Sequence, residues 1–491
     1  MMDMLDRFIC LWNFRRNRFA HVLAKADAHS CASNSLELWS YYRLKMYAAI
    51  VERTRTDRHW RGLFAKAVAF AACGRLGEAE VEAREFLRRA DCRPHREALA
   101  GALAPFMPEL AIQMLDNPSA SVSLRAALLL RTAAFSEARA VLKEAFAKGE
   151  QRRFPELHLY RSNTERGAPA QQLIRLNAFL QTYQLPQLSL CDAGLPPSPL
   201  NVQAPAPIKT VDGPLVSVLM TTYQTGQRAD MAIGAVLGQS YRNIELIIID
   251  DASDDETPDI VRAWATRDHR VKYLRLGCNG GTYLAKNIGL HHARGTFVTC
   301  HDSDDWSHPL KIERQVKPLL EDSRLIATVS YWVRMQDDGI FYARQVHPLM
   351  RMNSSSLLFR KDKVLKRAGA WDRVRTGADS EFLARLRLVF GDAAIRRVVQ
   401  PLALAAHRPD SLMTADATGY SDSGISSQRQ AYWEAWSRWH IDALRMRYQP
   451  RMPFDIERIE AERPFAVPRE IALRASDAAA CMASIECFPQ E

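Results

Sequence analysis

Short apolar runs alternate with amphipathic helical segments in the second half of the chain. Strands are predicted at 215–220, 245–249, 271–276 and 297–301, and helices between them at 228–239, 257–267 and 282–293. Apolar runs of this length indicate buried strands, and strands that alternate with helices form a mostly parallel sheet covered on both faces. The pattern therefore predicts an α/β domain, to which we assign residues 214–440.

The first part of the chain has helical periodicity instead. Between residues 57 and 149, a helix is predicted to open near Arg75, Met107 and Phe135, each after another Ala/Leu-rich helix and at offsets of about 30 residues. This loosely resembles tetratricopeptide repeats, while an irregular helical bundle fits the uneven spacing almost equally well. We expect an all-α domain over 1–185 that offers a protein-docking surface and carries no chemistry.

A proline-rich stretch separates the two patterns. Seven of the 24 prolines lie between Leu185 and Val216, a density that prevents both helices and central strands. We therefore predict an extended linker at 186–213. At the other end, residues 441–491 are predicted to form a tail of mixed helix and turn.

Composition and charge narrow the functional classes. The 491 residues are 47% hydrophobic and 25% charged, which is typical of a folded protein, and the net charge of +10 is spread without long basic runs. We therefore do not expect a nucleic-acid partner. No stretch approaches the length of a membrane helix, although Met4 to Leu23 could form a basic amphipathic helix that rests on an anionic bilayer or, alternatively, packs on the next helix.

The nine cysteines are scattered without a CxxC pair or a regular framework. In a long chain this distribution favours free, mostly buried thiols in a reducing compartment. We therefore expect a cytoplasmic protein, which could also bind peripherally to the inner face of a membrane.

Three carboxylates follow the strand at 297–301 within four positions: Asp302, Asp304 and Asp305. Carboxylates this close repel one another unless solvent or a cation compensates them, and a divalent metal is the simplest such cation. A solvated loop that caps the next helix is the alternative, because Asp and Ser both favour turns and helix N-termini.

Other strands also end in polar residues. Thr221, Thr222 and Tyr223 follow the first strand, and Asp250 and Asp251 follow the second. Because the carboxyl ends of parallel strands lie along one edge of a sheet, these side chains and the three carboxylates are expected to line one pocket.

Five ordered motifs from Pro214 to Arg408 resemble the family 2 glycosyltransferases of the nucleotide-diphospho-sugar transferase (GT-A) fold. They are Ser217–Tyr223, Ile249–Asp255, Asn279-Gly280-Gly281 with Lys286–Gly289, Ala293-Arg294-Gly295 and Asp302–Asp305. The resemblance implies that Thr222, Tyr223, Asp251, Lys286, Asp302 and Asp304 bind a nucleotide sugar. It also implies that Asp304 or Asp305 holds Mn²⁺ or Mg²⁺ against the diphosphate.

Further residues are implied downstream. The segment Gly377–Arg385 matches the one that carries the family's general base, and Asp379 is the best match, with Glu381 as the fallback, because Ala378 replaces the first acid of the usual pair. Alternatively, Asp379 caps a helix over 380–388 in which Glu381 pairs with Arg385. His407 and Arg408 match a segment that reaches the metal or the diphosphate.

The resulting hypothesis is a metal-dependent, inverting glycosyltransferase that moves a sugar, expected to be UDP-linked, to a glycan or lipid-linked acceptor in bacterial-type surface polysaccharide synthesis. An inactive transferase-like scaffold that binds protein partners through its helices is the alternative, and Ala378 favours it slightly. A sugar nucleotidyltransferase fits less well, because Thr221–Thr225 is not the Gly-rich basic loop expected after the first strand of that class.

Overall fold

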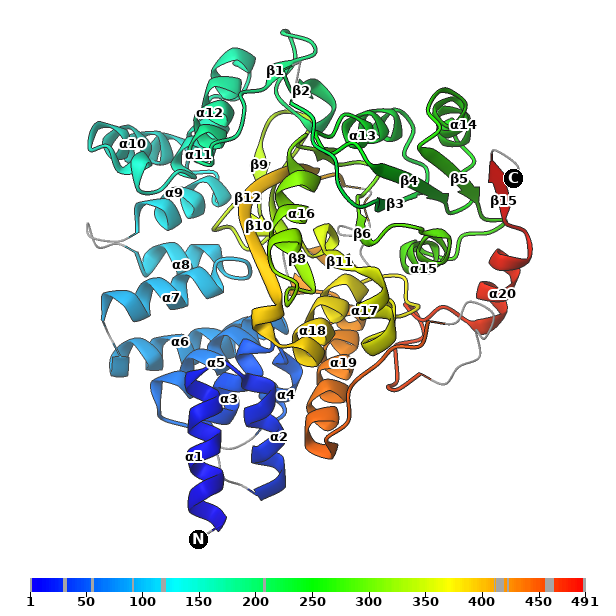
Figure 1. The fold of residues 1–491 in the computed structure, drawn as a ribbon. Helices are drawn as coiled ribbons and strands as arrows, with labels where there is room; N and C mark the ends of the chain where they lie inside the picture. Colours follow the sequence, from blue (N-terminus) through cyan, green and yellow to red (C-terminus); the bar gives the residue numbers. More distant parts are fainter. Residues whose placement is uncertain are drawn as a thin grey trace.

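The computed structural model describes residues 2–29, 33–53, 57–90, 92–115, 121–205, 209–409, 411, 419–421, 424–454 and 463–488. A column of helices lies beside a helix-flanked sheet (Figure 1). The helices of the column are α1 (Met2–Arg15), α2 (Phe19–His29), α3 (Asn34–Arg43), α4 (Tyr47–Val51), α5 (Trp60–Ala72), α6 (Leu76–Ala90), α7 (Arg93–Leu103), α8 (Pro108–Gln113), α9 (Val122–Arg131), α10 (Phe135–Ala147), α11 (Leu157–Thr164) and α12 (Pro169–Gln181).

The predicted helical region is confirmed, and its helices pack as sequential pairs. α5 contacts α6, α7 contacts α8, α9 contacts α10 and α11 contacts α12, so the helices predicted to open near Arg75, Met107 and Phe135 are the second members of three pairs. The pairs are unequal, because α6 has 15 residues and α8 only 6. The tetratricopeptide assignment stays a prediction.

The N-terminal segment forms two helices rather than the single helix predicted from Met4 to Leu23. The chain turns between Arg15 and Phe19, where Asn17 adopts a left-handed conformation with φ of 57°. Asn tolerates that conformation better than most residues, so a single local residue redirects the chain and lets α1 fold back on α2.

The proline-rich segment is not a simple extended linker. β1 (Ser189–Leu190) pairs antiparallel with β2 (Val202–Gln203). The Asn201 amide donates hydrogen bonds to the carbonyls of Asp192, Leu195 and Pro196 at 2.9–3.0 Å. Side-chain hydrogen bonds thus order a proline-rich loop whose described residues form no helix beyond one short turn.

An eleven-stranded mixed sheet forms the second region, in the order β15-β5-β4-β3-β6-β11-β8-β12-β7, with β9 and β10 also paired to β8. Its strands are β3 (Val216–Thr222), β4 (Ile244–Asp250), β5 (Val271–Arg275), β6 (Phe297–Cys300), β7 (Trp306–Ser307), β8 (Ala327–Met335), β9 (Phe341–Tyr342), β10 (Arg351–Met352), β11 (Leu358–Arg360), β12 (Ile395–Ala406) and β15 (Glu486–Phe488). A separate hairpin joins β13 (Tyr420–Ser421) and β14 (Gly424–Ile425).

The four predicted strands form the parallel part of this sheet: β5, β4, β3 and β6. Alternate residues of these strands enter two apolar clusters, so that Leu219 and Ile247 pack on one face and Val218 and Leu246 on the other. Burial on both faces explains why the strands are continuous apolar runs.

Helices cover both faces of the sheet. α15 (Thr282–His292) and α18 (Ala378–Phe390) contribute to one cluster, and α13 (Gln227–Leu237), α14 (Thr257–Arg267) and α16 (Lys311–Glu321) contribute to the other. α17 (Lys361–Arg367) follows β11 directly. The predicted α/β class is confirmed.

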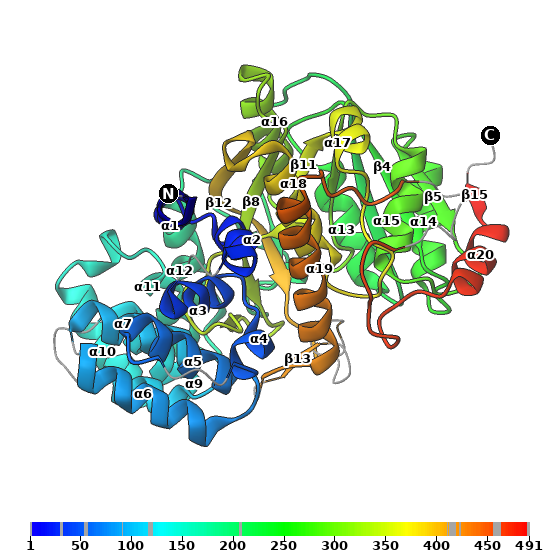
Figure 2. The same cartoon turned by 90° about the horizontal axis from the view of Figure 1, so that it is seen from below.

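One long helix joins the helical region to the sheet. α19 (Ser427–Met446) contacts α2, α4 and α18 (Figure 2). The Glu434 carboxylate accepts hydrogen bonds from the backbone N–H groups of Ala48 and Ala49 at 2.7 and 3.2 Å, and Trp433 Nε1 donates to the Leu44 carbonyl. The predicted domain end at residue 440 therefore falls inside a helix that connects the two regions.

The C-terminal segment is part of the fold. α20 (Ala475–Ala483) leads into β15, which pairs antiparallel with β5 at the edge of the sheet. The segment predicted as a tail thus adds an edge strand that pattern alone does not reveal, because three residues are too few for a periodic signal.

The expectation of free, mostly buried thiols is wrong. Cys278, just after β5, and Cys481 in α20 form a disulfide across 203 residues of sequence. Of the other cysteines described, Cys73, Cys92 and Cys191 are exposed, and Cys10 and Cys300 are buried. The sequence offered no spacing signal for a pairing this distant. In the described part of the chain, no helix is both long and apolar enough to cross a bilayer.

Candidate active site

The carboxyl ends of β3, β4 and β6 lie together, as predicted. Thr222 at the end of β3 is in register with Asp250 at the end of β4. The loop after β3 reaches the loop after β6, because the hydroxyls of Thr225 and Ser303 lie 3.1 Å apart. Residues about 80 positions apart therefore share one edge of the sheet.

The two carboxylates after β4 have different environments. Asp250 accepts hydrogen bonds from the Ser253 backbone N–H at 3.0 Å and the Tyr273 hydroxyl at 2.8 Å, so it stabilises the turn. Asp251 accepts from the backbone N–H groups of Gly280 and Gly281 at 2.7 and 2.8 Å. Burial raises the pKa of Asp251 to about 6, against the opposing effect of those two hydrogen bonds.

The residues at the end of β3 differ in exposure. Thr222 is buried, and its hydroxyl lies 2.7 Å from that of Thr225. Tyr223, the next residue, is 46% exposed. Of these two predicted binding residues, Tyr223 is therefore the one that offers its side chain to solvent.

Lys286 on α15 meets Asp379 on α18. The Lys286 ammonium donates to both carboxylate oxygens of Asp379, at 3.1 and 3.0 Å. Burial alone would lower the pKa of Lys286, but Asp379 together with Cys300, Asp302 and Tyr283 outweighs this effect and raises that pKa well above its usual value. The structure thus holds a buried cation directly against the predicted general base.

Three more side chains donate to the same carboxylate. They are the Tyr283 hydroxyl at 3.2 Å, the Ser355 hydroxyl at 3.0 Å and Trp371 Nε1 at 3.0 Å. Gly377, with φ of 90°, precedes α18, which begins at Ala378. Asp379 therefore lies inside the first turn, and the interpretation of Asp379 as the helix cap is wrong.

Glu381, the fallback base, is fully buried two residues further along α18. Its carboxylate accepts from Arg385 Nε and Nη2 at 2.8 Å and lies 3.1 Å from His440 Nε2. The alternative pairing of Glu381 with Arg385 is confirmed. This carboxylate is engaged inside the protein and does not face the strand ends.

The carboxylates after β6 also separate into different roles. Burial raises the pKa of Asp302. The charge of Lys286 opposes this rise and the charge of Asp379 adds to it, which indicates that Asp302 lies beside the Lys286–Asp379 pair. Asp304 is partly exposed and accepts a hydrogen bond from Arg408 Nε at 3.0 Å. Asp305 is buried and accepts from the backbone N–H of Ala406 at 2.9 Å.

The predicted metal ligands are therefore only partly assembled. His407 stacks on Tyr342 with ring centroids 3.8 Å apart, and Asp305 is hydrogen-bonded to β12. Among the described residues, no group of three or more His, Cys, Asp or Glu side chains is arranged to hold a metal. Asp302 and Asp304 still offer hard oxygen donors on the same loop, which suit Mg²⁺ or Mn²⁺ when phosphate oxygens complete the coordination.

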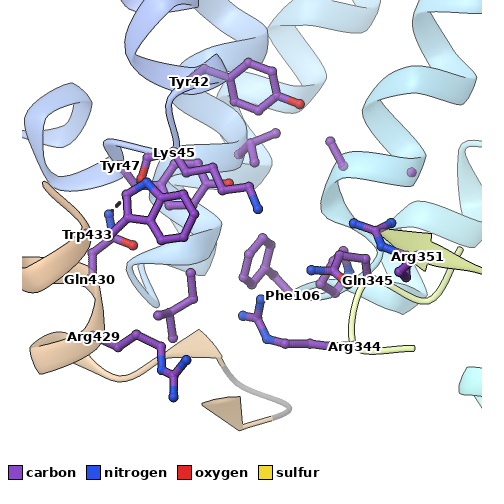
Figure 3. Close-up of a pocket in the computed structure, with 15 residues that line it drawn as sticks. Tyr42, Lys45, Tyr47, Phe106, Arg344, Gln345, Arg351, Arg429, Gln430 and Trp433 are labelled. Carbon is purple, nitrogen blue, oxygen red and sulfur yellow. Dashed lines mark hydrogen bonds between the residues drawn. The ribbon is translucent and has the colours of Figure 1, made fainter. Parts of the chain in front are cut away.

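A separate cavity of about 170 Å³ lies where the helical region meets the sheet region (Figure 3). Its lining combines aromatic and basic side chains from distant segments, including Tyr42, Lys45, Phe106, Arg344, Arg351, Arg429 and Trp433. Arg429 also donates to the Thr376 hydroxyl, three residues before Asp379. Sequence reasoning missed this cavity, because its lining comes from at least four separate parts of the chain.

Comparison with known proteins agrees with the motifs. The family described as glycosyl transferase family 2 matches residues 217–377. An uncharacterized glycosyltransferase of Haemophilus influenzae is 37% identical over 118 residues, which are 24% of this chain and 47% of the relative. TuaG of Bacillus subtilis, whose name assigns it to teichuronic acid biosynthesis, is 35% identical over 124 residues, or 25% of this chain and 49% of TuaG.

Among solved structures, TarS of S. aureus in complex with UDP-GlcNAc is 18% identical and covers 47% of this chain and 66% of its own, with a TM-score of 0.36. The chain spans less than half the length of the first curated relatives that it matches. Residues 217–377 are therefore a family 2 glycosyltransferase domain, which follows an all-helical region in this chain.

Proposed function

We propose that this protein is a metal-dependent, inverting glycosyltransferase that moves a sugar from a nucleotide diphosphate, UDP in the first instance, to a hydroxyl of a glycan or lipid-linked acceptor. The observation that carries the proposal is the contact of Lys286 with Asp379 beside Asp302, at the strand edge where Asp251 also lies. A family 2 domain supplies the reaction class.

Asp379 is the proposed general base. An inverting transfer needs a carboxylate that takes the proton of the acceptor hydroxyl as this hydroxyl attacks the anomeric carbon. Lys286, Tyr283, Ser355 and Trp371 all donate hydrogen bonds to Asp379 and fix its orientation. A side chain held from several directions loses little freedom when the substrate binds, which favours catalysis.

Asp251 and the loop Asn279–Gly281 are the proposed nucleoside site. An ionised carboxylate accepts hydrogen bonds, and uracil presents the N3–H group as a donor. The two glycine N–H groups already fix the orientation of the Asp251 carboxylate. The buried Thr222 is proposed to support the loop after β3 at this end of the site. The exposed Tyr223 is proposed to contact the nucleoside.

Asp302 and Asp304 are the proposed holders of Mn²⁺ or Mg²⁺, with Arg408 approaching the diphosphate. When bound, such an ion would offset the charge that develops on the departing diphosphate. We do not assign Asp305 or His407 to the metal, because Asp305 bonds to the backbone of Ala406 and His407 stacks on Tyr342.

Surface polysaccharide synthesis is the proposed setting, supported by the similarity to TuaG. A panel of UDP-, GDP- and TDP-sugars tests the donor, with metal-dependent release of the nucleoside diphosphate as the readout. Turnover of one UDP-sugar is expected, and the absence of turnover with the whole panel would contradict the proposal.

An inactive scaffold is the competing proposal, supported by Ala378 at the position of the usual first acid. Calorimetry of UDP with and without Mn²⁺ separates the two. An active transferase should bind UDP more tightly with the ion, whereas a scaffold should show no dependence on the ion.

A further inference from the structure

The first helix carries an apolar face that the rest of the described structure leaves exposed. Met4, Leu5, Phe8, Leu11 and Trp12 are 77%, 59%, 65%, 46% and 39% exposed. Their spacing of one, three and four residues places them on one side of α1. These five are nearly a third of the 16 large exposed hydrophobic side chains among the described residues, and the others lie scattered over many elements.

The opposite side of α1 packs against α2. Cys10 is buried in a small apolar cluster with Val22, and the rings of Phe14 and Phe19 contact edge to face with centroids 5.7 Å apart. The helix is therefore anchored by one side. Its exposed face is not simply the result of a helix without a packing partner.

Charge is distributed unevenly between the two sides. Arg7, Arg15, Arg16 and Arg18 are exposed on or just after α1. Asp6, by contrast, lies toward α2, where Lys25 Nζ donates to its carboxylate at 3.3 Å. The charged side chains described around the apolar face are thus arginines. Asp6, the acidic residue of α1 whose side chain is described, is paired with Lys25 of α2.

Trp12 lies where the apolar and basic parts meet. The Arg16 and Arg18 guanidinium groups lie 4.1 and 5.3 Å from the centre of its indole ring. Trp and Arg together favour the boundary between acyl chains and lipid headgroups, because the ring is amphipathic and the guanidinium binds phosphate. α1 also lies at the outer end of the helical column (Figure 1).

We propose that α1 docks this protein on an anionic lipid surface. The apolar face would enter the boundary between headgroups and acyl chains, and the arginines would contact lipid phosphates. Docking would leave the helix parallel to the membrane. The inference goes beyond glycosyl transfer, although it would bring the enzyme to the surface where a lipid-linked acceptor is found.

The test is sedimentation of the full-length protein with vesicles. The vesicles are phosphatidylcholine alone or phosphatidylcholine with about one third phosphatidylglycerol. We expect binding to the anionic vesicles, weakened about tenfold or more by the double variant Phe8→Ser/Trp12→Ser, because a single short helix depends on its few apolar side chains. Arg15→Gln/Arg16→Gln should reduce the preference for anionic lipid.

Phe135→Ser is the matched control, because Phe135 is 47% exposed and belongs to α10, which lies in a different part of the helical column from α1. It should bind vesicles like the unmodified protein. Unchanged binding by Phe8→Ser/Trp12→Ser, or no binding of the unmodified protein to anionic vesicles, would overturn the inference. A dimer that this double variant dissociates, without vesicle binding, would identify a second copy as the partner and also overturn it.

Two controls separate this inference from the proposed function. Circular dichroism of each variant checks that the helices remain folded. Donor turnover without vesicles should be equal in Phe8→Ser/Trp12→Ser and the unmodified protein, so a loss of vesicle binding alone does not bear on catalysis.

Discussion

At the scale of single residues, the Asp379 carboxylate is the most heavily bonded group of the site. Lys286, Tyr283, Ser355 and Trp371 all donate to it. These hydrogen bonds orient the carboxylate before any substrate arrives, which suits a general base. An acceptor hydroxyl must still displace or share one of these donors, and Ser355, which is only partly buried, is the one best placed to move.

Asp379→Asn removes the base and keeps the size of the side chain. We expect sugar transfer to fall by about 10²–10⁴-fold, the usual contribution of a general base, with UDP affinity unchanged because Asp251 and Asp302 remain. Asp259→Asn is the control, since that carboxylate is 85% exposed on α14. Transfer at the unmodified rate in Asp379→Asn would exclude Asp379 as the base.

Asp304→Ala removes one of the two carboxylates proposed to hold the ion. We expect UDP to bind equally well with and without Mn²⁺ in this variant, and transfer to be lost, because the ion no longer has its partly exposed carboxylate. Titration calorimetry measures the binding. A Mn²⁺ effect as large as in the unmodified protein would show that the ion binds elsewhere.

Asp251 should make stability depend on pH. The pKa of Asp251 is raised from 3.8 to about 6 in the folded state. Between these values the folded protein holds more protons than the unfolded chain, so this group makes the free energy of unfolding fall as pH rises from about 4 to 6. In Asp251→Asn, the free energy of unfolding measured by denaturant should lack this decrease between about pH 4 and 6. The same dependence on pH in Asp251→Asn and the unmodified protein would contradict the prediction.

At the scale of elements, α18 carries both the proposed general base and a structural ion pair. Asp379 in its first turn faces the strand ends, and Glu381, two residues later, pairs with Arg385 inside the protein. Arg385 also donates to the carbonyls of Ala368 and Ala370, which fixes the segment before Trp371. The buried Glu381–Arg385 pair thus fixes the part of α18 that carries Asp379.

Glu381→Gln should lower stability more than it affects the chemistry. Removing one partner of a buried ion pair leaves Arg385 uncompensated, at a cost of about 3–5 kcal/mol. The free energy of unfolding measures this loss. The double variant Glu381→Leu/Arg385→Met should recover part of it. Loss of transfer in a Glu381→Gln protein of unchanged stability would instead support Glu381 as the base.

At the scale of the whole molecule, the helical region and the sheet share a core. One apolar cluster contains Phe64 and Leu128 of the helices together with Val333 and Leu404 of the sheet and Ile441 of α19. The helical region is therefore not an independent module on a flexible linker. It supports one wall of the catalytic half and the cavity at the junction.

Glu434→Gln tests this connection. Glu434 satisfies two N–H groups at the start of α4, and its replacement weakens one of these hydrogen bonds. We expect a loss of about 1–2 kcal/mol in the free energy of unfolding, in a single cooperative transition because the core is shared. Glu470→Gln, at an exposed position, is the control. Two separate transitions would show that the regions unfold independently.

The sequence by itself determined the local pattern of this protein. Periodicity identified β3 to β6 and the helices between them, because burial on both faces leaves continuous apolar runs and helices leave a 3.6-residue repeat. The order of the motifs identified the family 2 domain. Asp251, Asp302 and Asp304 were found through the same ordered motifs, and Asp379 through the downstream segment Gly377–Arg385.

Only the tertiary structure decided which of these residues meet. Lys286 and Asp379 lie 93 positions apart, the two halves of the disulfide lie 203 apart, and Glu434 reaches Ala48 across 386. No local pattern encodes such contacts, since they depend on how whole elements pack. For the same reason, the sequence suggested a single amphipathic helix at the N-terminus, while the fold decided that α1 packs by one side and leaves its apolar face in solvent.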